Sequence, residues 1–124
     1  MLGTAKNQSF RARVAARGPN GHIMIGMAPA RINRDSSNYN KYAFCIYVND
    51  GGLYSGSGTK AQLSTAAIPE GAVVSVQLDR AQRTISFAVN GGPTVGSISQ
   101  LPDEDLYPFA EFREQGGAVE LLPL

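Results

Sequence analysis

The chain has 124 residues, of which 43% are hydrophobic and 17% are charged, with a formal net charge of +1. This balance is typical of one folded globular domain and excludes a disordered chain, which would have too few apolar residues to build a core. The longest apolar runs are only a few residues, so we expect no transmembrane span and no membrane partner. No basic segment followed by an apolar one opens the sequence, so we expect no secretory signal. The single cysteine, Cys45, excludes an internal disulfide and a zinc site built from cysteines, and it favours an intracellular location, cytoplasmic or nuclear.

The beginning of the chain divides into a leader and the first two strands. Residues 1–8 are polar and without pattern, so they are expected to be a leader or linker before one domain over residues 9–124. Ser9–Ala15 alternates apolar and basic residues, which predicts a strand with one solvent-exposed face. After a Gly- and Pro-containing turn, His22–Ala28 predicts a second strand, in which Gly26 permits a close approach of a neighbour or a bulge.

The middle of the chain begins with the longest irregular connection. Pro29–Lys41 has no period and is rich in Asn, Ser and Arg, and long loops in compact domains are often functional. Tyr42–Val48 is almost continuously apolar and predicts a central strand, and Leu53–Ser55 predicts a short one. Ala61–Ala67 could be a loose helical turn, but Pro69 follows it closely, so it is interpreted as irregular.

A hairpin follows, and it shows the clearest alternation in the sequence. Val73–Asp79 and residues 84–89 each alternate apolar and polar residues around a short polar loop, which predicts two antiparallel strands with one apolar face. Asn90-Gly91 then predicts a turn, because both residues tolerate positive φ. Three more strands are expected, at Thr94–Ser99, at Leu106–Phe112 with Pro108 favouring an edge or a strand start, and at Ala118–Leu122. Eight or nine short strands with turns between them predict an all-β sandwich of two antiparallel sheets.

Several segments, in their order, resemble the SPRY domain family. They are HIMIGMA at 22–28, GLY at 52–54, PEG at 69–71, the hairpin from Val73 to Gly91 with RTISFAVNG at 83–91, and LYP at 106–108 before a last hairpin. The resemblance covers about four-fifths of the chain. It implies a bent antiparallel sandwich with concanavalin-like jelly-roll architecture. The segment before the first strand is short and the chain has no tryptophan, so we expect a divergent member that lacks the first strands of the family.

The resemblance also implies a function, namely protein–protein interaction as an adaptor module without catalytic activity. In relatives that bind a short peptide, three regions line the pocket, and we expect them at one end of this sandwich. Arg and Tyr side chains, which are enriched at interaction hot spots, occur in these regions. Carried over by position, the expected partner-binding residues are Ala28, Pro29, Arg31, Asn33, Arg34, Asn38, Tyr39, Asn40, Tyr42, Arg113, Glu114, Gln115 and Gly116.

Other functions are weaker alternatives. Residues 1–60 contain eight Lys and Arg against two acids, a net +6, while residues 61–124 contain three Arg against eight acids, a net −5. The basic half suggests RNA or polyanion binding as the alternative function, although a sandwich that interleaves its halves would cancel this asymmetry. A lectin-like sugar site lacks a tryptophan platform. One His and one Cys, His22 and Cys45, do not assemble a catalytic or metal site, so no enzyme activity, cofactor or metal is expected.

The sequence also bears on partners beyond the binding loops. The segment before Ser9 is short, so an open sheet edge is one expectation, and the domain is expected to be a monomer or a weak dimer through such an edge. SPRY domains usually sit inside larger chains, so this one is expected to be part of a larger protein.

Overall fold

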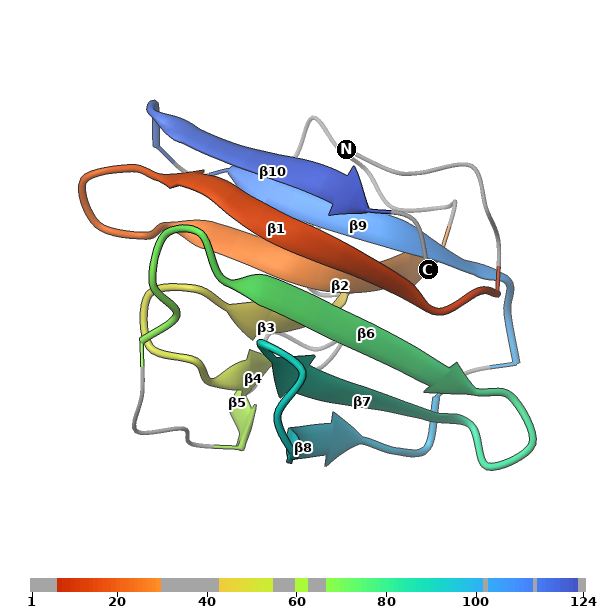
Figure 1. Ribbon diagram of the computed structural model, residues 1–124. Helices are drawn as coiled ribbons and strands as arrows, with labels where there is room; N and C mark the ends of the chain where they lie inside the picture. Colours follow the sequence, from red (N-terminus) through yellow and green to blue (C-terminus); the bar gives the residue numbers. More distant parts are fainter. Residues whose placement is uncertain are drawn as a thin grey trace.

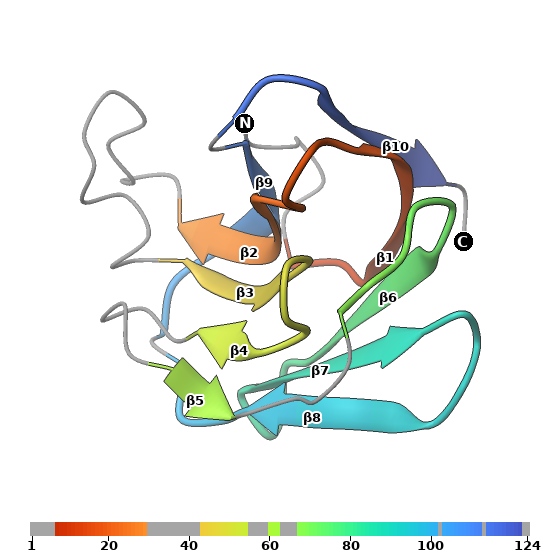
Figure 2. The same ribbon diagram turned by 90° about the vertical axis from the view of Figure 1, so that its left-hand side faces the viewer.

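The computed structural model describes residues 7–29, 43–54, 60–62, 67–101, 103–112 and 114–122. These residues form two five-stranded antiparallel sheets that face each other (Figures 1 and 2). The first sheet has the order β10-β1-β6-β7-β8 and the second has the order β5-β4-β3-β2-β9. The strands are β1 (Phe10–Arg17), β2 (Ile23–Pro29), β3 (Phe44–Tyr47), β4 (Leu53–Tyr54), β5 (Lys60–Gln62), β6 (Val73–Asp79), β7 (Thr84–Val89), β8 (Thr94–Ile98), β9 (Leu106–Phe112) and β10 (Gly117–Leu122). The prediction of an all-β sandwich of two sheets is therefore confirmed.

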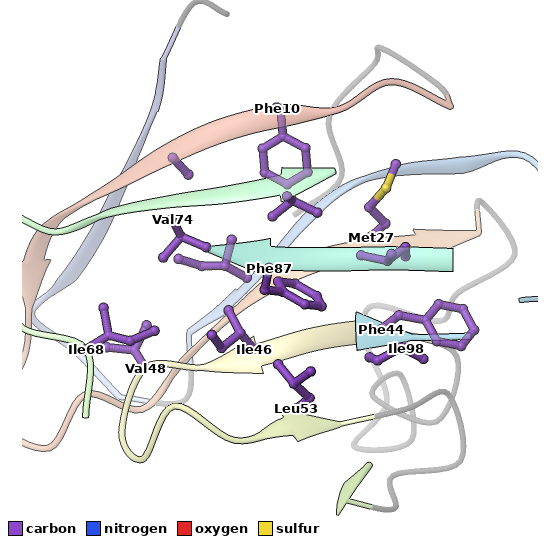
Figure 3. Close-up of a cluster of buried hydrophobic side chains, with 14 of the residues drawn as sticks. Phe10, Met27, Phe44, Ile46, Val48, Leu53, Ile68, Val74, Phe87 and Ile98 are labelled. Atoms are coloured by element: carbon purple, nitrogen blue, oxygen red, sulfur yellow. The ribbon is translucent and has the colours of Figure 1, made fainter. Parts of the chain in front are cut away.

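The alternation in the sequence decides which side chains fill the space between the sheets. In β1, the even positions from Phe10 to Val14 are buried while the arginines between them are exposed. The same period places Val74, Val76, Ile85 and Phe87 of the β6–β7 hairpin in the interior. Figure 3 shows Val74 and Phe87 in one apolar cluster with residues such as Ile46 and Leu53 of the second sheet. Removing this apolar surface from water is the main contribution that holds the two sheets together.

The backbone requires glycine or asparagine at two places, a close approach of two strands and a turn with positive φ. Gly26 in β2 lies against β3 so closely that a Cβ there would overlap the backbone carbonyl oxygen of Phe44, which confirms the expected close approach. After β7, Asn90 and Gly91 both have positive φ, at 54° and 69°, and form the predicted turn. The side-chain oxygen of Asn90 also accepts a hydrogen bond from the backbone N–H of Val73, which ties this turn to the start of β6.

Two expectations about strand position are confirmed, and one expectation is wrong. β3 lies between β4 and β2, as expected for a central strand, and β9 with its internal Pro108 lies at the edge of its sheet. The segment Ala61–Ala67 was expected to be irregular, whereas its first residues belong to β5, which pairs with β4. Three residues are too few to show a period, so this strand forms only because β4 offers it a pairing edge.

The outer face of the second sheet is also packed. Met24, Ala28, Ala43, Cys45 and Phe109 are all buried in a second apolar cluster on the side away from the first sheet. Cys45 therefore occupies the packing position that its apolar strand predicted. Burial raises the pKa of its thiol, and the charge of Glu111 raises it further, so the nucleophilic thiolate is strongly disfavoured.

Candidate partner-binding surface

The structure separates the residues that were expected to form one binding surface. Ala28 and Pro29 are buried at the end of β2, where they pair with Tyr107 and Leu106 at the start of β9. Glu114, Gln115 and Gly116 form the turn between β9 and β10, at the other end of the sandwich. The other expected residues, Arg31, Asn33, Arg34, Asn38, Tyr39, Asn40, Tyr42 and Arg113, lie outside the described residues.

The expectation of one shared end is therefore wrong for Ala28 and Pro29 relative to residues 114–116. β2 and β9 are antiparallel and pair from Ile23 with Phe112 to Pro29 with Leu106. At about 3.4 Å per residue, this pairing separates Pro29 from the turn after Phe112 by roughly 20 Å. The end of the sandwich with residues 114–116 instead contains the turns 18–22 and 48–52, which Figure 2 shows from that side.

Glu114 joins two of these turns through its carboxylate. One oxygen accepts hydrogen bonds from the backbone N–H groups of Asn20, at 2.8 Å, and His22, at 3.3 Å. The other accepts one from the side-chain amide of Asn20, at 3.1 Å, and lies 3.7 Å from Nδ1 of His22. Partial desolvation alone would raise the pKa of Glu114, but the hydrogen bonds and the His22 side chain outweigh it, so the pKa is lowered.

Arg17 and Asn49 fix the neighbouring turns at the same end. The guanidinium of Arg17 donates to the carbonyl oxygen of Ile68 at 3.0 Å, and its backbone N–H donates to the Glu70 carboxylate at 2.9 Å. The Asn49 side chain donates to the carbonyl oxygen of Asn20 at 2.7 Å. These bonds connect segments that are far apart in the sequence, so the exposed residues of the turns are presented from a fixed backbone.

A short row of rings lies next to this network, on the outer face of the second sheet. The rings of His22 and Tyr47 stack with centroids 6.2 Å apart, and Tyr47 meets Tyr54 edge-on at 5.7 Å. The Tyr54 hydroxyl donates to Asp50 at 3.4 Å. Half-buried aromatic rings with polar ends suit a partner surface, because they bury area and still form hydrogen bonds. The sequence carries a signal for this row, because the period of two in a strand places Tyr47 on the face with Cys45, opposite Phe44 and Ile46.

Among the described residues, the basic strand β1 does not lie apart from the acidic second half of the chain. β1 lies between β10 and β6, which both belong to the acidic second half. On the exposed face, Arg13 forms an ion pair with Glu120 at 2.7 Å. The charge asymmetry along the sequence is therefore partly cancelled where the strands interleave, as the simpler interpretation predicted.

Two kinds of feature are absent from the described residues. Among them, no group of three or more His, Cys, Asp or Glu residues could hold a metal ion. In the same part of the chain, no helix is long and apolar enough to cross a membrane.

Comparison with known structures identifies the fold independently of the residues above. The SPRY domain of human HERC1 superimposes with a TM-score of 0.83 at 18% identity, over 97% of this chain and 79% of that one. A human SPRY domain gives 0.80 at 22% identity over 98% and 81% of the two chains, and the TRIM65 PSpry domain gives 0.73 at 14% identity over 99% and 68%. The sequence has no significant match among curated proteins. The model of the SPRY domain family matches residues 9–122, which is nearly the whole chain, and the chain therefore belongs to the SPRY domain family.

Proposed function

We propose that this chain is a binding module that recognises a short segment of a partner protein and catalyses no reaction itself. Family membership is the observation that carries the proposal, because SPRY domains generally serve protein–protein interaction and generally occur within larger chains. Fixed turns at the end of a sandwich support it, since binding residues are commonly placed on loops held by a rigid scaffold.

The expected binding residues divide into two groups, and the second group can also be tested alone. The first group lies in the connection after Pro29 and includes Arg31 and Tyr39. The second group is the turn before β10, where Gln115 is exposed while the Glu114 carboxylate is occupied by backbone N–H groups. Gln115 is therefore better suited than Glu114 to contact a partner, because its side chain does not have to leave a hydrogen-bond network first.

Affinity capture with the purified chain, read by mass spectrometry, tests the proposal. We expect a protein partner that is retained at moderately high salt and is lost when Arg31, Tyr39 and Arg113 are replaced together by alanine. Gln115→Ala tests the second group, and Gln77→Ala, on the exposed face of β6, is the matched surface control. Capture that is unchanged by both the triple variant and Gln115→Ala would refute the placement of the site.

The same experiment separates the polyanion alternative. Nucleic acid that is captured only at low salt would indicate binding through counterion release, and the proposed function would then be wrong. No captured protein at either salt concentration would also contradict it.

A further inference from the structure

The edge strand β10 leaves apolar side chains uncovered. Among the described residues, β10 pairs only with β1, and Figure 1 shows it along the border of its sheet. Val119 pairs with Val14 and Leu121 pairs with Ala12, so both point toward the space between the sheets. Nevertheless, Leu121 is 62% exposed and Val119 is only partly buried.

A cavity of about 70 Å³ lies beneath this strand, between β10 and β9. Its lining is apolar and includes Phe10, Pro108, Ala110, Val119 and Leu121. Water in such a site lacks polar partners, so covering the opening with apolar groups is favourable. This border of the sandwich is therefore incompletely filled.

A second exposed hydrophobic residue, Phe112 at the end of β9, lies next to the start of β10. Phe112 is 38% exposed and lies beside Gly117, where an added Cβ would be 3.0 Å from the Ile23 side chain and 3.3 Å from the Phe112 ring. Gly117 and Leu121 are four positions apart on the inward-facing side of β10, a distance of about 14 Å. One end of β10 thus presents a leucine, and the other end presents a glycine next to a phenylalanine.

We propose that β10 pairs in antiparallel fashion with β10 of a second copy of this chain, about a two-fold axis at Val119. This register places Val119 opposite Val119, Leu121 opposite Gly117, and Glu120 opposite Ala118 of the other copy. The inward side of Gly117 is occupied by Ile23 and Phe112 of the same copy, so Leu121 of the other copy packs over the glycine and against the exposed part of the Phe112 ring. Two-fold symmetry repeats this contact at both ends of the pairing and joins the two five-stranded sheets into one.

The neighbouring registers are less favourable. Directly opposed residues in antiparallel strands lie on the same face, so the register changes in steps of two residues. An axis at Glu120 would place two carboxylates opposite each other, which is destabilising. An axis at Leu121 would leave Gly117 and Phe112 beyond the paired residues of the described strand. The axis at Val119 avoids both problems and keeps Glu120 with Arg13 on the solvent side.

Sedimentation velocity over a range of protein concentrations tests the proposal with the full chain. We expect a dimer that forms increasingly with concentration and is lost in Leu121→Lys, because the new charge would be buried against Phe112 of the other copy. Leu121 is mostly exposed in the single copy, so the variant keeps its fold, which a thermal melt checks. Val95→Lys, at the 37%-exposed hydrophobic residue of the far edge strand β8, is the matched control and retains the dimer.

A disulfide tests the register. Val119→Cys is expected to form a disulfide between copies under oxidising conditions, because opposed residues have Cα atoms about 4.5–5.5 Å apart. Glu120→Cys is expected not to cross-link, since its nearest counterpart lies diagonally across the strands. The natural Cys45 is buried and does not interfere.

Four results would overturn the proposal: a single copy at every concentration, a dimer that persists in Leu121→Lys, a dimer that is lost in Val95→Lys, or cross-linking through Glu120→Cys. The first result would also be obtained if another protein or another segment, rather than a second copy, covers this edge.

Discussion

Replacement of Phe87 by alanine provides a quantitative test of how the two sheets are held together. Phe87 lies in the middle of β7, is fully buried, and is one of the largest side chains of the core (Figure 3). Phe87 pairs with Val76 of β6 on one side and with Gly96 of β8 on the other, so the backbone around it is fixed on both sides. A site held in this way has little freedom to collapse into the space that the ring leaves.

The expected loss of stability is therefore large. Phe→Ala in a core costs about 3–5 kcal/mol from lost apolar burial and the remaining cavity. Small domains have a total stability of about 5–15 kcal/mol, so this change removes a substantial part of it. For a chain of this length, each kcal/mol corresponds to about 4 °C in Tm, which predicts a decrease of roughly 12–20 °C.

Urea denaturation followed by far-UV circular dichroism measures this effect. We expect a lower midpoint with an unchanged m-value, because the surface exposed on unfolding is nearly the same. Val95→Ala, at a partly exposed residue of β8, is the control and is expected to change stability by no more than about 0.5 kcal/mol. If Phe87→Ala cost less than about 1 kcal/mol, the ring would not be packed between the sheets as described.

Three further outcomes are expected. The folded state lowers the pKa of Glu114, so the stability that this carboxylate contributes is present above its ordinary pKa and is lost as the pH falls through the lower folded value. The difference in urea midpoint between the wild-type chain and Glu114→Gln should therefore shrink on acidification. A constant difference would contradict the hydrogen-bond network around Glu114. Gly26→Ala should lower the Tm markedly, because its Cβ would overlap the Phe44 backbone, and an unchanged Tm would show that β2 and β3 are less close. Cys45 should resist a thiol reagent in the native state and react on unfolding, and rapid native reaction would show that the thiol is accessible.

Much of the fold follows from the period of two in the sequence. The alternation correctly predicted the hairpin that begins with the Val73–Asp79 strand, and the turn residues correctly predicted the Asn90-Gly91 turn. Alternation reports which face of a strand is buried, and it does so reliably when the strand is long enough to show several repeats. β5 could not be found in this way, because three residues show no period and the strand depends on its neighbour β4.

Strand neighbours could not be predicted in the same way. β1 pairs with β10, for example Arg13 with Glu120, although more than a hundred residues separate them in the chain. Such pairs are decided by how the two sheets close around a common core, which no local pattern records. The expectation that Ala28 and Pro29 share one end with residues 114–116 failed for this reason. The antiparallel pairing of β2 with β9 was needed to place these residues, and the strand order of the sheet supplies it.

The same pairing changes which residues of the last turn are suitable for binding. In the sequence, Glu114 and Gln115 are adjacent polar residues of one turn and appear equivalent. In the structure, Glu114 accepts hydrogen bonds from Asn20 and His22, and moving its carboxylate would leave those backbone N–H groups without an acceptor in the protein. Gln115 is exposed on the backbone that Glu114 fixes. A partner that contacts this turn is therefore expected to lose affinity directly when Gln115 is replaced, whereas replacing Glu114 acts by loosening the turn and also lowers the Tm. Measuring affinity and Tm for both variants separates contact from support.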